Sequence, residues 1–193
     1  KYNILRNQIL IVFLLSMIIV LLFVGSTTYN IVLNLITDKA EKQMQQTALE
    51  ATGRMESLYQ QVDMLSVQIA TDSKVQQLLL NDVKGQRLSF SDKQSLMRNI
   101  DQLLIYSNGI TSIELYGRDF QKLVPLDEID LSSRLEFEWI KQANLENGGM
   151  VWIGRDPNDP TYFLAIRCIK LMDQSFSTGG YLLIQINPNY FQL

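Results

Sequence analysis

Residues 9–24 read ILIVFLLSMIIVLLFV, and this segment decides how the chain is organised. It lies within residues 7–37, which include no charged residue. The hydrocarbon core of a bilayer is about 30 Å thick and needs about 20 mostly apolar residues, a length that residues 9–29 supply. We therefore expect a membrane-spanning helix. A buried core helix is the least favoured interpretation, because a soluble domain of this size does not need so long an uncharged segment.

A cleavable signal peptide is the rival interpretation of the same segment. Lys1 and Arg6 form a basic flank, and Gly25 and Ser26 are small residues of the kind that a signal peptidase accepts. Apolar character then resumes at Ile31, Val32, Leu33, Leu35 and Ile36. This continuation favours an uncleaved anchor, which we assign to residues 1–37.

Basic residues flank both ends of the expected span, so the positive-inside rule alone does not fix its orientation. Lys1 and Arg6 precede the span, and Lys39 and Lys42 follow it. Residues 38–193 have the polar composition of a folded, exportable domain. We therefore expect the amino terminus inside, and residues 38–193 outside the cytoplasm at the cell membrane. Because Met does not begin the sequence, we also expect a few residues before Lys1.

Composition narrows the function of residues 38–193, which are long enough for one domain with a core. Taking Lys1 and Arg6 from the 17 basic residues leaves 15 against 20 acidic residues, a net charge of −5, which argues against nucleic acid as a partner. The single cysteine, Cys168, cannot form an internal disulfide. The sequence has no histidine, which excludes Ser-His-Asp and Cys-His catalysis, histidine metal sites and a phospho-accepting histidine in this chain. We expect no enzyme activity and no cofactor here; an exported enzyme that uses a carboxylate pair is the least favoured of the alternative functions.

A long helix is predicted after the span, because small and apolar residues recur in alternating steps of four and three. Such a 3.5-residue period is typical of a coiled-coil seam, or of a helix that packs against one surface. The stripe can pack on a sheet, pair with a second copy of the chain in a homodimer, or do both. Its members are Met44, Ala48, Ala51, Met55, Leu58, Val62, Leu65 and Ile69.

Three shorter helices follow in the prediction. Asp72 or Ser73 caps a helix that ends at Leu80, and the next residues to Gly85 form a connection. Ser91 and Gln94 have the spacing of a capping box at the start of a helix that stops before residues 108–109. A further helix is expected over residues 133–147.

Strand signals dominate the second half of the domain. They predict a hairpin within residues 113–124, then strands at residues 150–153, 162–172 and 179–186. These segments predict one antiparallel sheet of about five strands, so the fold class is α+β. Asp127, Glu128 and Asp130 are interpreted as a solvated loop. Asn187 and Pro188 resemble the start of another helix, so we expect the chain to continue past Leu193.

The order of these parts resembles the extracytoplasmic Cache sensor region of YesM-like sensor histidine kinases. The residues behind the resemblance are Trp139, Ala143, Gly149, Val151, Trp152, Ile166, Lys170, Gly180, Leu182, Leu183, Ile184, Ile186 and Asn187. The resemblance implies a PAS-like antiparallel sheet docked on a long amino-terminal helix, with a second span, a HAMP segment and a kinase elsewhere in the protein. Many Cache domains have Arg shortly before the Trp and an aromatic residue after it, whereas this chain has FEWI at residues 137–140. The resemblance therefore does not extend to amino-acid recognition.

A small-molecule pocket is the site expected on such a fold, lined by aromatic side chains with a few polar groups. Placement by resemblance puts Trp139 and Trp152 near it, although Trp139 also fits the apolar side of its helix. Arg155 is a candidate for pairing with an anionic or hydroxylated ligand, or is a solvated turn residue. Tyr162 and Arg167 have opposite parity on one strand, so at most one of them faces the pocket. Asp156 and Asp159 lack the spacing of a calcium loop and are interpreted as turn residues.

These observations favour a ligand-sensing input domain of a bacterial receptor, most plainly a two-component histidine kinase whose kinase part is absent from this sequence. Its partners would be a small extracellular molecule or a solute-binding protein. The same input on a transcription factor, cyclase or chemoreceptor is an alternative. Another alternative is a membrane-tethered binding or scaffold protein that transmits no signal.

Overall fold

The computed structural model describes residues 2–86, 89–125, 129–187 and 189, and for residues 2–9 only the backbone. The chain divides into two units, Lys1–Thr52 and Gly53–Leu193. A single 70-residue helix, α1 (Tyr2–Thr71), includes residues of both units. The helix therefore continues through residues 25–28, as the apolar residues after Ser26 predict.

In the first unit, the apolar side chains of α1 are exposed. Between Leu10 and Ile36 no side chain is buried, and the large apolar residues range from 43% exposed at Leu33 to 70% at Phe23. Interpretation as a buried core helix is therefore wrong. Within the described residues, α1 is the one helix long and apolar enough to cross a membrane.

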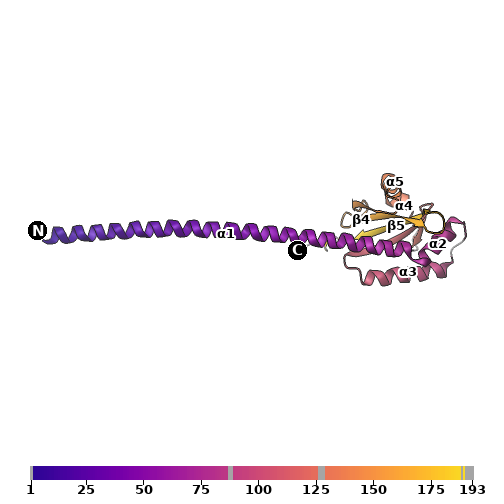
Figure 1. Cartoon of the computed structure of the whole chain (residues 1–193), viewed down its shortest axis with the longest axis horizontal. Coiled ribbons are helices and arrows are strands. Elements are labelled where there is room, and N and C mark those ends of the chain that lie inside the picture. Colours follow the sequence, from indigo (N-terminus) through magenta and orange to yellow (C-terminus); the bar gives the residue numbers. More distant parts are fainter. Residues whose placement is uncertain (1, 87–88, 126–128, 188, 190–193) are drawn as a thin grey trace. The chain divides into compact units, whose positions relative to one another are not determined.

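The second unit is built on an antiparallel sheet of five strands in the order β2-β1-β5-β4-β3. This confirms the α+β class and the predicted antiparallel sheet. The strands, which Figure 1 shows beside the helices, are β1 (Ile110–Gly117), β2 (Lys122–Val124), β3 (Met150–Arg155), β4 (Phe163–Leu171) and β5 (Ser177–Ile186).

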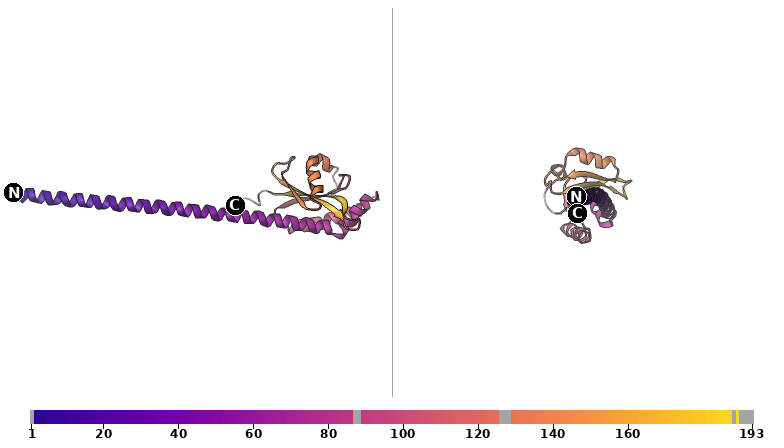
Figure 2. Two further views of the ribbon diagram at one scale, coloured as in Figure 1. Left: turned by 45° about the horizontal axis from the view of Figure 1, so that its top comes forward. Right: turned by 90° about the vertical axis from the view of Figure 1, so that its left-hand side faces the viewer.

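Both faces of the sheet are covered, because alternate residues of β4 and β5 enter two different hydrophobic clusters. On the first side, here the α1 face, Ala165 and Leu182 pack with the last turns of α1, with α2 (Ser73–Val83) and with α3 (Phe90–Ile105). On the other side, the α5 face, Ile166 and Leu183 pack with α4 (Leu131–Arg134) and α5 (Phe137–Leu145). Figure 2 shows α5 and α3 on opposite sides of the sheet.

The 3.5-residue stripe of α1 is buried in only part of its length. Leu58, Val62, Leu65 and Ile69 are at most 6% exposed and join the core on the α1 face, which confirms that this part packs on the sheet. Met44 is 74% exposed and Met55 44%. The part of the stripe nearer the apolar segment is thus open to solvent.

Helix boundaries differ from the prediction at several points. α2 continues to Val83 instead of ending at Leu80. The N-cap of α3 is Ser89, whose Oγ accepts a hydrogen bond from the Ser91 backbone N–H at 3.2 Å, so the capping box at Ser91 is wrong by two residues. The helix predicted over residues 133–147 is interrupted at Leu135, which is extended (φ −136°, ψ 150°) and buried. β3 extends through Gly154 to Arg155. Asp127, Glu128 and Pro188 lie outside the described residues.

Candidate functional site

The five residues proposed from sequence do not form one site. Trp152 and Arg167 point to the α1 face, whereas Trp139 is half-buried against the cluster on the α5 face. Arg155 is exposed at the end of β3, and Tyr162 is half-buried just before β4. The sheet therefore separates the two tryptophans.

Arg167 ties α1 to the sheet. From β4 its guanidinium donates to the Ser66 hydroxyl at 2.8 Å, to the Asp63 carboxylate and to the Gly148 carbonyl oxygen. Burial lowers the pKa of Arg167, and the Asp63 carboxylate only partly opposes this effect. Since all three guanidinium nitrogens contact α1 or the turn before β3, Arg167 joins these two elements to the sheet.

Trp152 lines an apolar pocket between α1 and the sheet. Its ring meets that of Tyr59 edge to face, with the centroids 4.2 Å apart and the planes at 85°. The pocket has a volume of about 380 Å³, and small-molecule sites begin at about 300 Å³. The pocket is lined by Met55, Leu58, Tyr59, Trp152, Gly154, Phe163 and Ile186. It includes the predicted Trp152 but neither Arg155 nor Tyr162.

An irregularity in β3 explains why space remains beside Trp152. The register of β3 on β4 shifts between Trp152 and Gly154, which is characteristic of a β-bulge. Gly154 has a φ of +96°, a conformation that residues with a side chain rarely adopt, and a Cβ atom there would meet no atom within 4 Å. Gly154 lines the pocket, and because it has no side chain the pocket stays open at this point.

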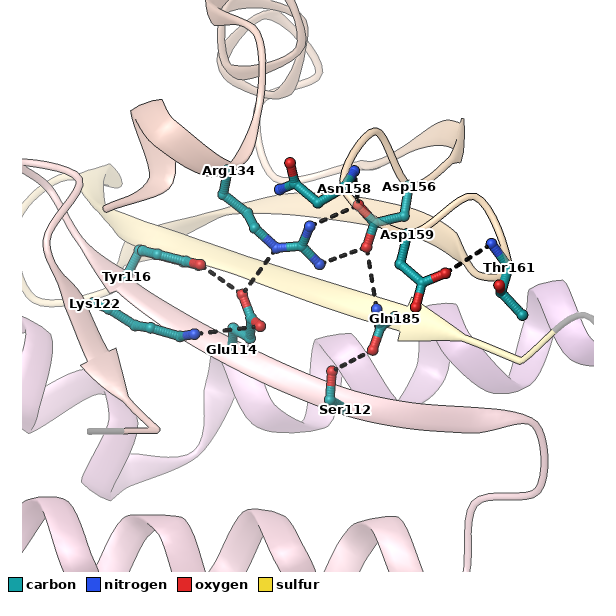
Figure 3. A network of polar contacts seen from close by, with 10 residues as sticks. All are labelled: Ser112, Glu114, Tyr116, Lys122, Arg134, Asp156, Asn158, Asp159, Thr161 and Gln185. Carbon is teal, nitrogen blue, oxygen red and sulfur yellow. Dashed lines mark hydrogen bonds and ion pairs between the residues drawn. The ribbon is translucent and has the colours of Figure 1, made fainter. Parts of the chain in front are cut away.

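A second candidate is a polar cluster on the α5 face, made of Glu114, Tyr116, Lys122, Arg134, Asp156 and Gln185 (Figure 3). Arg134 donates two hydrogen bonds to Asp156, at 2.6 and 2.5 Å. The Glu114 carboxylate accepts from the Tyr116 hydroxyl at 2.5 Å and lies 3.3 Å from Lys122 Nζ. Gln185 donates to Asp156 at 3.1 Å.

The charges of this cluster are buried but compensated. The side chains of Asp156 and Lys122 are 0% and 3% exposed, and those of Arg134 and Glu114 are 10% and 14% exposed. Burial acts to raise the pKa of Asp156, but hydrogen bonds from Arg134 and the Asn158 backbone outweigh it, so this pKa lies below its usual value. Two acids and two bases balance, and within the described residues no buried side-chain polar atom lacks a partner. The cluster is therefore a hydrogen-bond network whose groups pair with one another, and it joins α4, the turn after β3 and the sheet.

No family model matches this chain. A search of curated proteins finds no match either. The interpretation of the two candidate sites therefore depends on their geometry.

Sequence reasoning missed the polar cluster and Tyr59. Asp156 was interpreted as a turn carboxylate, and it does accept a hydrogen bond from the Asn158 backbone at 2.9 Å, but it also pairs with Arg134. Arg134 is not predicted as a partner of Asp156, because it falls within the helix predicted over residues 133–147. Tyr59 follows Leu58 of the stripe directly, and its position beside the buried seam was the available signal for a pocket residue. The described residues contain no group of three acidic, Cys or His side chains that could hold a metal ion.

Proposed function

We propose that this chain is the ligand-sensing input region of a bacterial transmembrane receptor, with a sensor histidine kinase as the output that the Cache resemblance favours. Residues 38–193 lie outside the cytoplasm, and α1 anchors them in the cell membrane. The antiparallel sheet packed on a long amino-terminal helix is the arrangement that the resemblance implies. The chain acts as a homodimer, paired through the part of the predicted helix 44–69 that the sheet leaves uncovered, from Met44 to Ala51.

The observation that supports sensing is that the Trp152 pocket has walls from two elements. Met55, Leu58 and Tyr59 come from α1, and Trp152 and Phe163 come from the sheet. A molecule in this pocket contacts both, so its binding energy depends on where α1 lies on the sheet. A ligand shifts a conformational equilibrium only by its difference in affinity for the two states, and about 1.4 kcal/mol corresponds to a tenfold difference.

The lining also indicates the class of ligand. The walls are almost entirely apolar and include the aromatic rings of Tyr59, Trp152 and Phe163. They suit a compact molecule with an aromatic or branched aliphatic part, taken up directly or delivered by a solute-binding protein. The paired polar cluster on the α5 face is the competing location, for a polar ligand that would displace its internal partners.

A thermal-shift screen of small molecules against the full chain in detergent tests this proposal. For any molecule that raises the melting temperature, Trp152→Ala should abolish the shift, and Trp139→Ala, the matched control on the α5 face, should preserve it. Loss of the shift in Glu114→Gln with retention in Trp152→Ala would move the site to the polar cluster. Retention in both variants would place the site elsewhere.

Hydrogen exchange distinguishes a sensor from a tethered binding or scaffold protein. In a sensor, ligand should change the exchange of α1 amides beyond the pocket, at residues 44–51, as well as around Tyr59 and in β3. A protein that only binds should change exchange at the pocket walls, around Tyr59 and in β3, without any change at residues 44–51. That second result would support the scaffold alternative.

A further inference from the structure

The stripe of α1 continues into the apolar segment without a change of register. Continuing from Met44 toward the amino terminus by the same steps of three and four gives Glu41, Thr37, Asn34, Asn30, Thr27, Phe23, Val20 and Ser16. Five of these eight residues are uncharged but polar. Together with Val20 and Phe23, these five form what we call the transmembrane seam: Ser16, Val20, Phe23, Thr27, Asn30, Asn34 and Thr37.

The hydroxyl groups of the seam are satisfied by their own helix. Ser16 Oγ donates to the Phe13 carbonyl oxygen at 2.8 Å, Thr27 Oγ1 to that of Phe23 at 2.9 Å, and Thr37 Oγ1 to that of Leu33 at 2.9 Å. These three side chains therefore enter an apolar environment at little cost.

Asn30 and Asn34 differ from the hydroxyl residues. Both side chains are exposed, and within the described part of the chain neither amide has a hydrogen-bond partner. Residues 9–29 supply the length of the hydrocarbon core, so Asn30 and Asn34 lie just beyond it, toward the headgroups. A helix that packs over this line removes both amides from water, which is costly unless they gain hydrogen bonds.

The chemistry of the amide indicates what covers it. A carboxamide has two N–H donors and a carbonyl acceptor, so it is complementary to another carboxamide. Two identical helices related by a twofold axis place Asn30 opposite Asn30 and Asn34 opposite Asn34. A buried Asn in such a seam also fixes register and the number of helices. A helix without a matching amide would leave the groups unpaired.

We infer that a second copy of this chain packs against the transmembrane seam, with interhelical hydrogen bonds at Asn30 and Asn34. This inference rests on the proposed function in so far as α1 must cross a membrane. It extends the dimer contact from the exposed Met44 and Ala48 and the half-buried Ala51 into the bilayer along one register. Glu41 is the one charged residue on this line, and it lies beyond the uncharged segment.

Cysteine crosslinking of the full chain in phosphatidylcholine vesicles tests the face. In a Cys168→Ala background, Phe23→Cys, Thr27→Cys and Thr37→Cys should form dimers on oxidation. Thr28→Cys and Val32→Cys, which lie off the seam, should crosslink at least fivefold less. Equal crosslinking at all five positions, or a maximum at residues 28 and 32, would overturn the inference.

The amides are tested by the dissociation constant of the dimer, measured by energy transfer between labelled copies. Asn30→Leu with Asn34→Leu should raise it by about threefold to thirtyfold, the range of interhelical hydrogen bonds in membranes. Thr28→Val, the control, should change it by less than twofold. An unchanged constant in the double variant would overturn the role of the amides.

Neither readout uses ligand, so failure of the ligand proposal leaves the seam unaffected. Extraction of the chain from vesicles by carbonate would refute the membrane anchor, and the seam with it.

Discussion

The guanidinium of Arg134 holds the carboxylate of Asp156 through two parallel hydrogen bonds, at 2.6 and 2.5 Å. Arg134 ends the four-residue helix α4, and Asp156 begins the turn between β3 and β4. The pair fixes two connections against the sheet, and the side chains are 10% and 0% exposed. When either partner of such a planar bidentate pair is removed, the remaining charge stays buried without its two hydrogen bonds, which destabilises the fold.

Asp156→Ala should therefore lower the free energy of unfolding by about 3 to 5 kcal/mol, because it removes both hydrogen bonds from the buried Arg134 charge and leaves it only the longer contact with Glu114, at 3.9 Å. Urea unfolding of the full chain in detergent, followed by tryptophan fluorescence, measures this loss. Asp159→Ala is the control: its carboxylate is exposed and, among the residues that the structure describes, accepts only the Thr161 backbone N–H, at 3.0 Å, so the cost should stay at about 1 kcal/mol. If Asp156→Ala and Asp159→Ala lose the same free energy of unfolding, the Arg134–Asp156 pair does not stabilise the fold.

Asp156 also gives a pH dependence whose sign is fixed. Its pKa is lower in the folded than in the unfolded chain, where a carboxyl titrates near 3.9, so the folded state prefers the charged form. The stabilisation is present above about pH 4 and is lost as the pH falls through the depressed folded pKa. Because other carboxylates titrate as well, the measured quantity is the stability difference between the native chain and Asp156→Asn. That difference should shrink below about pH 4, and a difference independent of pH would contradict the assignment.

Much of the fold could be predicted from local pattern, whereas the contacts that close it could not. Alternation at Ile113 and Leu115 and apolar segments bounded by turn residues predict the strands, and a 3.5-residue period predicts the buried part of the stripe at Leu58, Val62 and Leu65. The same period continues through the exposed part of the stripe at Met44. Sequence spacing therefore does not distinguish the part of the helix that the sheet covers from the part that it leaves exposed. The break at Leu135 arises from tertiary packing, since Leu135 is buried while extended.

The candidate site shows the same limit. Trp152 was predicted as a pocket residue and does line a pocket, but its neighbour Tyr59 lies far from it in the sequence. Arg167 is one of two pocket candidates on its strand, because parity lets at most one of Tyr162 and Arg167 face the pocket. Its partners Ser66 and Asp63 are 101 and 104 residues away, and no local pattern connects them.

Arg167→Met should loosen the end of α1 from the sheet. The change removes donors to Ser66, Asp63 and Gly148, and a loss of about 2 to 4 kcal/mol is expected, because the guanidinium is buried although the Asp63 side chain is 55% exposed. Hydrogen exchange at residues 58–69 should become faster. Arg155→Met, at an exposed position, should leave both quantities unchanged. If the exchange rate at residues 58–69 is the same in Arg167→Met as in the native chain, apolar packing alone holds α1 on the sheet.

The anchor can be separated from a signal peptide by sequencing the amino terminus of the exported protein. We expect the native start, because α1 is helical without interruption through Gly25 and Ser26. A new terminus near Ser26 or Thr27 would contradict the anchor. Gly25→Leu, which removes one of the two small residues that a signal peptidase would accept, should leave the terminus unchanged.

The exposed part of the stripe gives the last prediction, which concerns how a signal leaves the domain. Leu58 is 1% exposed, so it is occupied by the sheet and cannot meet a second copy, whereas Met44 is 74% exposed. Single cysteines at positions 44, 48 and 51, in a Cys168→Ala background, should therefore crosslink between copies, and a cysteine at position 58 should not. Leu49 is the matched control, because it is as exposed as Met44 (74%) but lies off the stripe.

The same positions test whether ligand acts through α1. Small shifts or rotations of a helix at a packed interface are a common means of switching, because such interfaces have discrete arrangements. A ligand in the Trp152 pocket contacts Met55 and Tyr59, so it should change the relative crosslinking at positions 44, 48 and 51. If ligand leaves the relative crosslinking at these three positions unchanged, ligand binding does not move α1. Uniform crosslinking, or none at any position, would leave the stripe as an intramolecular packing surface and remove this route for the signal.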